Sequence, residues 1–241
     1  MPVSRRIFCN VGTLLLLCCL LPAGCRWPSR EPAPHPYGTT ALMTAAGNGN
    51  LGEVERLLRG GARVNDRTPE GLTALHYAAQ SNNYQVVEAL LKAGARVNAR
   101  AKDGSTPLLR SLDGAKGMPE ISLRLIWAGA DVSLRDDSGN TPLIIAADES
   151  SYEVVQQLLM HGADPNAANN SGDTALHMAA QSGYYHRVEL LLSYGANANA
   201  RNKDGQTPLD VAHADAPATD AADRDLEDEL ARVRELLQAK K

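Results

Sequence analysis

The 241-residue sequence predicts an all-α fold in which pairs of short helices repeat along the chain. The first observation is a pattern that begins with glycine and recurs every 33 to 35 residues. It opens at Gly38, Gly71, Gly104, Gly139, Gly172 and Gly205. The second observation is that each unit carries start and stop signals for two helices. A fixed period of this size predicts a stacked array rather than one globular core.

The first helix of each unit is predicted from a threonine whose hydroxyl can cap a helix amino terminus. The six threonines are Thr40, Thr73, Thr106, Thr141, Thr174 and Thr207. Pro107, Pro142 and Pro208 follow three of them, and proline at the first helical position forfeits no hydrogen bond. In the second unit we expect this helix over 74–79, and we expect the polar residues 81–83 to end it.

The second helix of each unit is predicted from an apolar stripe at helical spacing. In the second unit valines and leucines provide this stripe over 86–91, and the helix should stop at Gly94. The glycines at the same place in other units are Gly61, Gly129, Gly162 and Gly195. A left-handed helix cap suits a residue without a Cβ. The extended segment that follows, such as 95–98, leads to the next glycine turn, and we call it the finger.

This arrangement resembles the ankyrin repeat. The motifs that carry the resemblance are GxTALHxAA at 71–79 and 172–180, GxTPL at 104–108, 139–143 and 205–209, and LLxxGAxxN near the end of most units. The resemblance covers about 38 to 213 and implies an ankyrin-repeat solenoid of helix-turn-helix pairs with β-hairpin-like fingers. It also implies that the concave face and finger tips bind partner proteins, and that His76 and His177 hold the turn by local hydrogen bonds.

The period divides the chain into units. We place the ankyrin repeats at 38–70, 71–103, 104–138, 139–171 and 172–204, and a capping repeat at 205–241.

The third repeat is two residues longer between its helices, which is either a binding feature or drift in a tolerated loop. Pro119 should open its second helix, and Trp127 lies near the end of that helix. The last repeat ends in a predicted capping helix with an apolar stripe over 226–237, after an acidic run that we interpret as a solvated end face.

Residues 1–24 are predicted to be a signal peptide. Arg5 and Arg6 precede an apolar run of 11 residues, and small residues follow before Cys25. The run is shorter than the roughly 20 residues that span a bilayer, so we expect cleavage rather than a transmembrane anchor. General secretion fits the leucine-rich run, and the paired arginines leave the twin-arginine route as the alternative.

The residues before Cys25 resemble a bacterial lipoprotein box, which implies lipidation of this cysteine. The box departs from its family because Pro22 occupies the position of the usual leucine, so soluble secretion stays open.

The proline-rich residues 25–37 are predicted to be an extended linker. All four cysteines lie within the first 25 residues, so the mature chain would contain no disulfide. We therefore expect a protein of the bacterial envelope that faces the periplasm on a lipid anchor, or else a soluble periplasmic or secreted protein.

Several function classes are disfavoured by the sequence. The GxGxxG at 47–52 follows a predicted helix rather than a strand, which excludes a dinucleotide site. No HExxH, GxSxG or calcium-loop pattern occurs, so we expect no enzyme, cofactor, metal site or small-molecule substrate. The net charge of −4, with one Phe and two Trp, disfavours nucleic acid.

Two sets of residues recur at matching positions of the repeats and are candidates for partner binding. They are the finger arginines Arg67, Arg100, Arg135 and Arg201, and the tyrosines Tyr84, Tyr152 and Tyr185 at the start of second helices. Arginine and tyrosine are common anchors of protein interfaces. Against this, the carboxylates Glu70, Asp103, Asp137 and Asp204 should lie close enough to neutralise the arginines.

We therefore expect a non-enzymatic, monomeric protein that binds or scaffolds a partner protein in the cell envelope. An accessory or inhibitor protein of an exported enzyme is the alternative, and a secreted effector that binds a host protein is a third hypothesis. The sequence does not name the partner.

Overall fold

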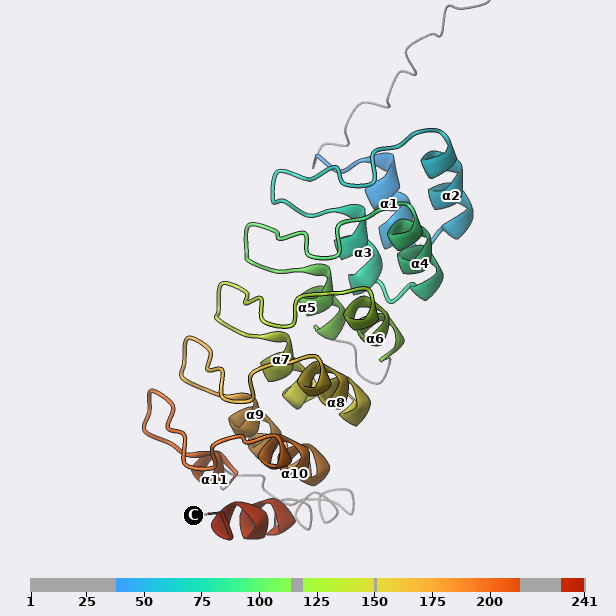
Figure 1. The fold of residues 1–241 in the computed structure, drawn as a ribbon. Helices are drawn as coiled ribbons and strands as arrows, with labels where there is room; N and C mark the ends of the chain where they lie inside the picture. The colour runs from blue at the N-terminus through green and yellow to red at the C-terminus, as the bar shows by residue number, and fades with distance from the viewer. Residues whose placement is uncertain (1–37, 114–118, 150, 213–230, 241) are drawn as a thin grey trace, which may run out of the picture. The chain divides into compact units, whose positions relative to one another are not determined.

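The computed structural model describes residues 38–113, 119–149, 151–212 and 231–240. Within these ranges all regular elements are helices, joined by fingers that contain one isolated antiparallel bridge, Ala168 to Thr174. The all-α array of helix pairs predicted from the sequence is confirmed (Figure 1). The predicted signal peptide, Cys25 and the linker to residue 37 lie outside the described residues.

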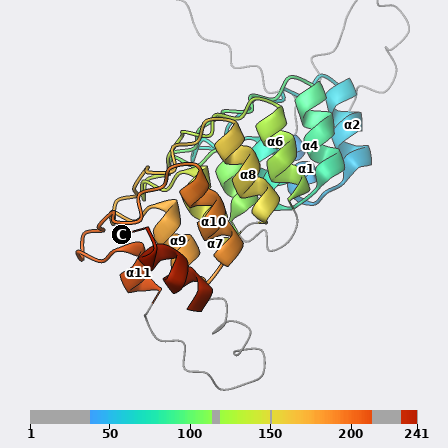
Figure 2. The ribbon, with the colours of Figure 1, turned by 60° about the horizontal axis from the view of Figure 1, so that its bottom comes forward.

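The helices form two layers. The first helices of the repeats are α1 (Ala41–Gly47), α3 (Ala74–Gln80), α5 (Pro107–Leu112), α7 (Pro142–Glu149), α9 (Ala175–Gln181) and α11 (Pro208–Val211). The second helices are α2 (Leu51–Arg59), α4 (Tyr84–Lys92), α6 (Glu120–Trp127), α8 (Tyr152–Met160) and α10 (Tyr185–Ser193). Each helix packs against the helix of the same layer in the next repeat. Figure 2 shows the second helices side by side in one row.

Helix ends follow the predicted capping residues. The Thr106 hydroxyl accepts a hydrogen bond from the Leu109 amide at 3.3 Å, and Thr40 and Thr207 cap α1 and α11 in the same way. The glycines predicted to end the second helices all have a positive φ, between 84° and 87°. Capping by threonine and left-handed glycine therefore sets the repeat length.

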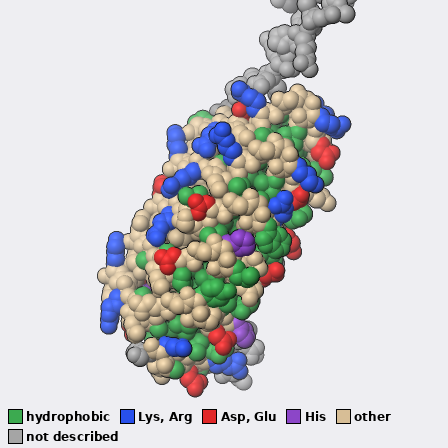
Figure 3. All heavy atoms as spheres, in the orientation of Figure 1, with side chains coloured by type: hydrophobic (Ala, Val, Ile, Leu, Met, Phe, Trp, Pro, Cys, Tyr) green, Lys and Arg blue, Asp and Glu red, His purple; other side chains and the backbone are tan. Residues whose placement is uncertain are grey.

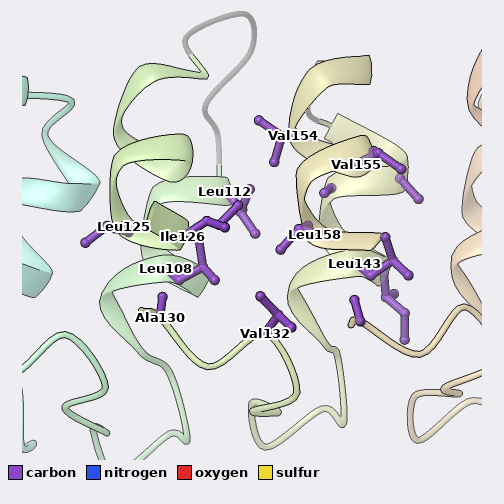
Figure 4. Close-up of a cluster of buried hydrophobic side chains, with 14 of the residues drawn as sticks. Leu108, Leu112, Leu125, Ile126, Ala130, Val132, Leu143, Val154, Val155 and Leu158 are labelled. Atoms are coloured by element: carbon purple, nitrogen blue, oxygen red, sulfur yellow. The ribbon is translucent and has the colours of Figure 1, made fainter. Parts of the chain in front are cut away.

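The core runs from repeat to repeat. In Figure 4, Leu112 and Ile126 of the third repeat face Val154 and Leu158 of the fourth, and these side chains are almost fully buried. Neither repeat covers this surface alone, so burial of apolar area couples neighbours, which is the stabilising interaction of repeat arrays.

The fingers are joined by backbone hydrogen bonds. One amide of each finger donates to a carbonyl of the preceding finger over 2.7 to 3.0 Å. The pairs are Lys102 to Glu70, Asp137 to Asp103, Asn170 to Ser138 and Lys203 to Ser171. Gly172 shows how close the fingers lie, because a Cβ there would be 2.9 Å from the Lys203 nitrogen.

Asparagines add a second link at three of the junctions. Asn98, for example, donates to the Gly129 carbonyl at 3.3 Å and accepts from the Asp131 amide at 2.8 Å. Asn65 and Asn166 make the equivalent pair of bonds to the repeats that follow them. The third repeat has Ser133 at this position, and its hydroxyl bonds to Asp131 of the same repeat. The junction between the third and fourth repeats therefore lacks this link, although Asn170 donates to the Asp137 carbonyl across it at 2.8 Å.

The two irregular repeats are described in part. Residues 114–118 of the third repeat lie outside the described residues, α6 is capped by Pro119 one residue before its first helical position, and Trp127 is its last residue. Residues 213–230 of the last repeat are also outside. Beyond them, residues 231–238 are helical with Val233 and Leu237 buried. Arg234 donates from Nη2 to the Ala212 carbonyl at 2.9 Å, which joins this helix to the end of α11.

Candidate protein-binding surface

The finger arginines predicted from the sequence are placed in register by the stacking of repeats. Arg67 donates to the Arg100 carbonyl at 3.1 Å, and Arg100 donates to the Arg135 carbonyl at 2.8 Å. Arg135 continues the series to the Ala168 carbonyl at 2.5 Å, whereas Arg201 reaches only Gly205 of the same turn. Three of the four guanidinium groups therefore link one finger to the next.

The side chains of these arginines are nevertheless exposed, and Figure 3 shows Lys and Arg side chains along the edge formed by the fingers. Among the described residues, none of the four arginines forms a direct ion pair with the neighbouring carboxylates. Asp103 pairs instead with Arg110, at 2.6 Å. A role of the finger arginines in partner binding stays a prediction.

The tyrosines lie on the layer of second helices. Tyr84 and Tyr152 are the first residues of α4 and α8, and both are 44% exposed. Tyr185 is partly buried against the core, whereas its neighbour Tyr184 and Tyr194, which follows α10, are 42% and 44% exposed. In this repeat Tyr185 is therefore less exposed than Tyr84 and Tyr152, the tyrosines predicted at the same position of other repeats.

Tyr184 is held in place by Arg187. The Arg187 guanidinium carbon lies 3.6 Å from the centroid of the Tyr184 ring. The same guanidinium donates to the carbonyls of Ala147 and Asp148, at 2.9 and 3.0 Å, at the carboxyl-terminal end of α7. Burial lowers the pKa of Arg187, but arginine remains charged at neutral pH. This side chain joins the fourth and fifth repeats.

A pocket of about 430 Å³ lies between the fingers and the first helices of the third to fifth repeats, and we call it the groove. Its lining residues are Asp103, Ser105, Leu109, Arg110, Asp113, Asp136, Asp137, Ser138, Asn140, Ile144, Ile145, Asp148 and Met178. Five aspartates and one arginine give the lining a formal charge of −4. The groove is thus an acidic concavity lined by residues of the third to fifth repeats and by Asp103 at the end of the second.

Most charges of the groove have partners within the protein. The Asp103 carboxylate accepts from the amide and hydroxyl of Ser105 and from Arg110. Partial burial alone would raise the pKa of Asp103, but the hydrogen bonds from Ser105 and the charge of Arg110 hold it below its ordinary value. Asp136 accepts from the Asn140 amide at 2.8 Å. These bonds fix the orientation of the groove wall.

Sequence reasoning missed the groove, although a signal was present. Asp113 and Asp148 each lie seven residues after the capping threonine of their repeats, and the first two repeats have Gly47 and Gln80 at this position. A side chain that recurs at one position of adjacent repeats projects from one surface of the stack.

The histidines three residues after the capping threonines of the second and fifth repeats have a structural role. His76 Nδ1 lies 2.9 Å from the Thr73 hydroxyl, and its Nε2 lies 3.3 Å from the Ser105 carbonyl of the next repeat. His177 makes the corresponding contacts with Thr174 and Gln206. Burial lowers the pKa of His76 to about 4, so the ring is neutral at pH 7. Among the described residues no group of His, Cys, Asp and Glu has the arrangement of a metal site.

Comparison with known families identifies the repeats. The family described as ankyrin repeats (3 copies) matches residues 7–101, 99–169, 114–202 and 152–216. The chain belongs to the ankyrin-repeat family. Ankyrin-repeat proteins are generally non-enzymatic interaction modules, and no catalytic family is indicated. Membership therefore suggests that this ankyrin-repeat protein takes part in protein–protein interaction.

Two solved structures from bacteria are similar to this ankyrin-repeat protein. An ankyrin repeat domain from Acinetobacter baumannii AYE is 32% identical with a TM-score of 0.68, over 83% of this chain and 96% of that chain. A chain in the complex of a predatory endopeptidase from Bdellovibrio bacteriovorus with an immunity protein is 27% identical with a TM-score of 0.69, over 84% of this chain and 99% of that chain. Among curated proteins, none matches the chain. Within the described residues, no helix has the length and apolarity needed to cross a membrane.

Proposed function

We propose that the chain is an exported ankyrin-repeat protein that binds a partner protein in the bacterial envelope through the groove and the fingers. The observation that carries the proposal is the groove itself, a concave, open surface whose backbone is fixed by inter-repeat hydrogen bonds. A rigid surface loses little conformational entropy when a partner binds, which favours affinity. The family supports protein binding as the general activity.

The export part of the proposal rests on the amino-terminal sequence. Paired arginines, an apolar run of 11 residues and small residues before Cys25 are the features of a signal peptide. We propose that Cys25 becomes the lipidated first residue and that the linker holds the repeats away from the membrane. Soluble export to the periplasm or the medium is the alternative.

Inhibition of an exported enzyme is the second candidate function. The observation that favours it is the similarity to a chain in the endopeptidase–immunity protein complex, which extends over nearly the whole of that chain. In such a role the groove and the fingers would cover the partner's active site. The scaffold and the inhibitor share one binding surface and differ only in whether the partner loses activity.

Export is tested by fractionating cells that produce the full chain or its Cys25→Ala variant. We expect the wild-type chain in the membrane fraction, with its signal peptide removed. We expect the variant in the soluble fraction, or as a longer chain that keeps its signal peptide. Recovery of the wild-type chain in the cytoplasm would refute export, and unchanged membrane association of the variant would refute lipidation.

Partner binding is tested by purifying the mature chain from envelope extracts after crosslinking. We expect a stoichiometric partner protein, and an inhibitor would also lower the activity of that partner when titrated in at equimolar amounts. The comparison chain carries Ile145→Arg and Met178→Arg, which place bulky charges on the groove, and its helix content is first checked against the wild type by circular dichroism. Equal recovery of the partner by both chains would remove the groove from the proposal.

A further inference from the structure

The charges of the groove specify what kind of segment it fits. We infer that the groove receives an extended, basic segment of the partner protein, in which arginine or lysine side chains alternate with apolar ones. This inference rests on the proposed function, because it takes the groove as the place where the partner binds. It adds the chemistry of the bound segment, which neither the family nor the similar structures specify.

Two carboxylates of the groove lack partners within the described part of the chain. Asp113 and Asp137 are exposed, and no described residue donates a hydrogen bond to either side-chain carboxylate. Asp136 and Asp148, in contrast, accept from Asn140 and Ser182. The unpartnered pair is therefore available to an incoming cation without loss of a bond that supports the fold.

The two carboxylates belong to different walls. Asp113 follows the last residue of α5, and Asp137 lies in the finger between the third and fourth repeats. The arginine of the lining, Arg110, is already paired with Asp103. A negative concavity with no free cation in its lining attracts positive side chains and repels acidic ones.

The floor of the groove is apolar. Ile145 and Met178 are partly buried and occupy the position four residues after the capping threonine. The equivalent residues of the first three repeats are Thr44, Tyr77 and Arg110, so the aliphatic floor is specific to the fourth and fifth repeats. Successive side chains of an extended segment point to opposite sides. Basic side chains can thus meet the aspartate walls while apolar ones contact the floor.

The size of the groove favours an extended segment over a folded element. Its volume of about 430 Å³ lies at the lower end of the range of binding pockets, roughly 300 to 1,000 Å³. A few side chains fill such a space, whereas a helix about 10 Å across does not enter it. Arginine is the better cation here because its guanidinium binds carboxylates with two parallel hydrogen bonds.

The test uses the full mature chain and a short fluorescent peptide that alternates arginine with leucine. Matched peptides with glutamine or glutamate in place of arginine are the controls, and binding is followed by anisotropy at low and high salt. We expect the arginine peptide to bind, the other two to bind at least tenfold more weakly, and the affinity to fall as salt rises.

The protein variant is Asp113→Asn with Asp137→Asn, and its matched control is Glu153→Gln with Glu189→Gln, which removes two exposed carboxylates from α8 and α10. We expect about tenfold weaker binding of the arginine peptide for the first variant and less than twofold change for the second. Equal loss in both variants would mean a general effect of charge and would overturn the inference. So would equal binding of the glutamine peptide, or binding of the arginine peptide only when calcium ions are present.

Failure of the inference and failure of the proposed function give different results. If the envelope partner is recovered equally with wild type and with the Asp113→Asn, Asp137→Asn variant, the basic segment is refuted and protein binding stands. If the arginine peptide binds as expected but no envelope protein is recovered, the groove chemistry stands and the proposed cellular role falls.

Discussion

The fingers and the groove both display charged side chains, but they use them differently. In the fingers, Arg67, Arg100 and Arg135 donate to backbone carbonyls of the next repeat, so part of each guanidinium is committed to stacking. In the groove, the side-chain carboxylates of Asp113 and Asp137 accept no hydrogen bond from the described residues. An exposed charge therefore indicates a binding role only after its partners within the protein have been accounted for.

The largest expected effect concerns the close approach of the fingers. Gly172 and Gly205 occupy the same position in successive repeats, with φ of 84° and 76°. A Cβ on Gly172 would lie 2.9 Å from the Lys203 nitrogen, whereas a Cβ on Gly205 would have no atom within 4 Å. We expect Gly172→Ala to lower the free energy of unfolding by about 3 kcal/mol, and Gly205→Ala by about 1 kcal/mol from backbone strain alone. Urea denaturation measures both, and equal losses would show that finger contact contributes nothing.

A similar loss of free energy of unfolding is expected at low pH from His76, the buried histidine at the base of the fingers. The folded-state pKa of His76 is about 4, below its ordinary value of 6.5, so the unfolded chain binds the proton more tightly. Its contribution is therefore complete above pH 6.5 and is lost as the pH falls toward 4, by up to about 3 kcal/mol. Denaturation midpoints measured across this range should fall more steeply for the wild type than for His76→Gln.

The exposed His161 supplies the control for this titration. Its ring contacts only the Gln157 carbonyl of the preceding turn. His161→Gln is measured in parallel, as a substitution of the same type at an exposed position. If His76→Gln retains the wild-type slope, groups other than His76 cause the acid sensitivity.

The smallest expected effect comes from a direct comparison of a finger arginine, Arg100, with a groove aspartate, Asp137. Arg100→Ala removes a hydrogen bond to the next finger and should lower the free energy of unfolding by about 0.5 kcal/mol. Asp137→Asn removes no side-chain bond of the described structure, and we expect a change within about 0.3 kcal/mol. Thermal denaturation of the two variants decides this. A larger loss of stability for Asp137→Asn than for Arg100→Ala would contradict the assignment of Arg100 to repeat stacking and of Asp137 to partner binding.

Much of the fold was predictable because its signals are local. Capping threonines and left-handed glycines act within a few residues, and their recurrence predicted the helix pairs. The acceptors of the finger arginines were not predictable, because they are backbone carbonyls of the next repeat and no side chain marks them. The partial burial of Tyr185 was not predictable either, because α10 begins at this residue and the more exposed Tyr184 precedes the helix.

The groove was hidden for a different reason. Asp113 comes from a helix end and Asp137 from a finger, and their positions in the repeat differ. Both belong to the third repeat, and the concavity that they line is completed by residues of the stacked fourth repeat, such as Ile145, and by Met178 of the fifth. A search for one residue type at one position detects ladders and overlooks surfaces assembled from several positions.

The serine that replaces asparagine at position 133 has a consequence for cooperativity. The junction that lacks this asparagine link is among those that the groove spans. In a nearest-neighbour array the weakest interface determines where unfolding divides the chain. If that interface is this junction, the first three repeats exchange amide hydrogens as one block and the remaining repeats as another. A ligand seated across that interface would couple the two blocks. Occupancy of the groove would then be measurable as synchronised hydrogen exchange on both sides of it.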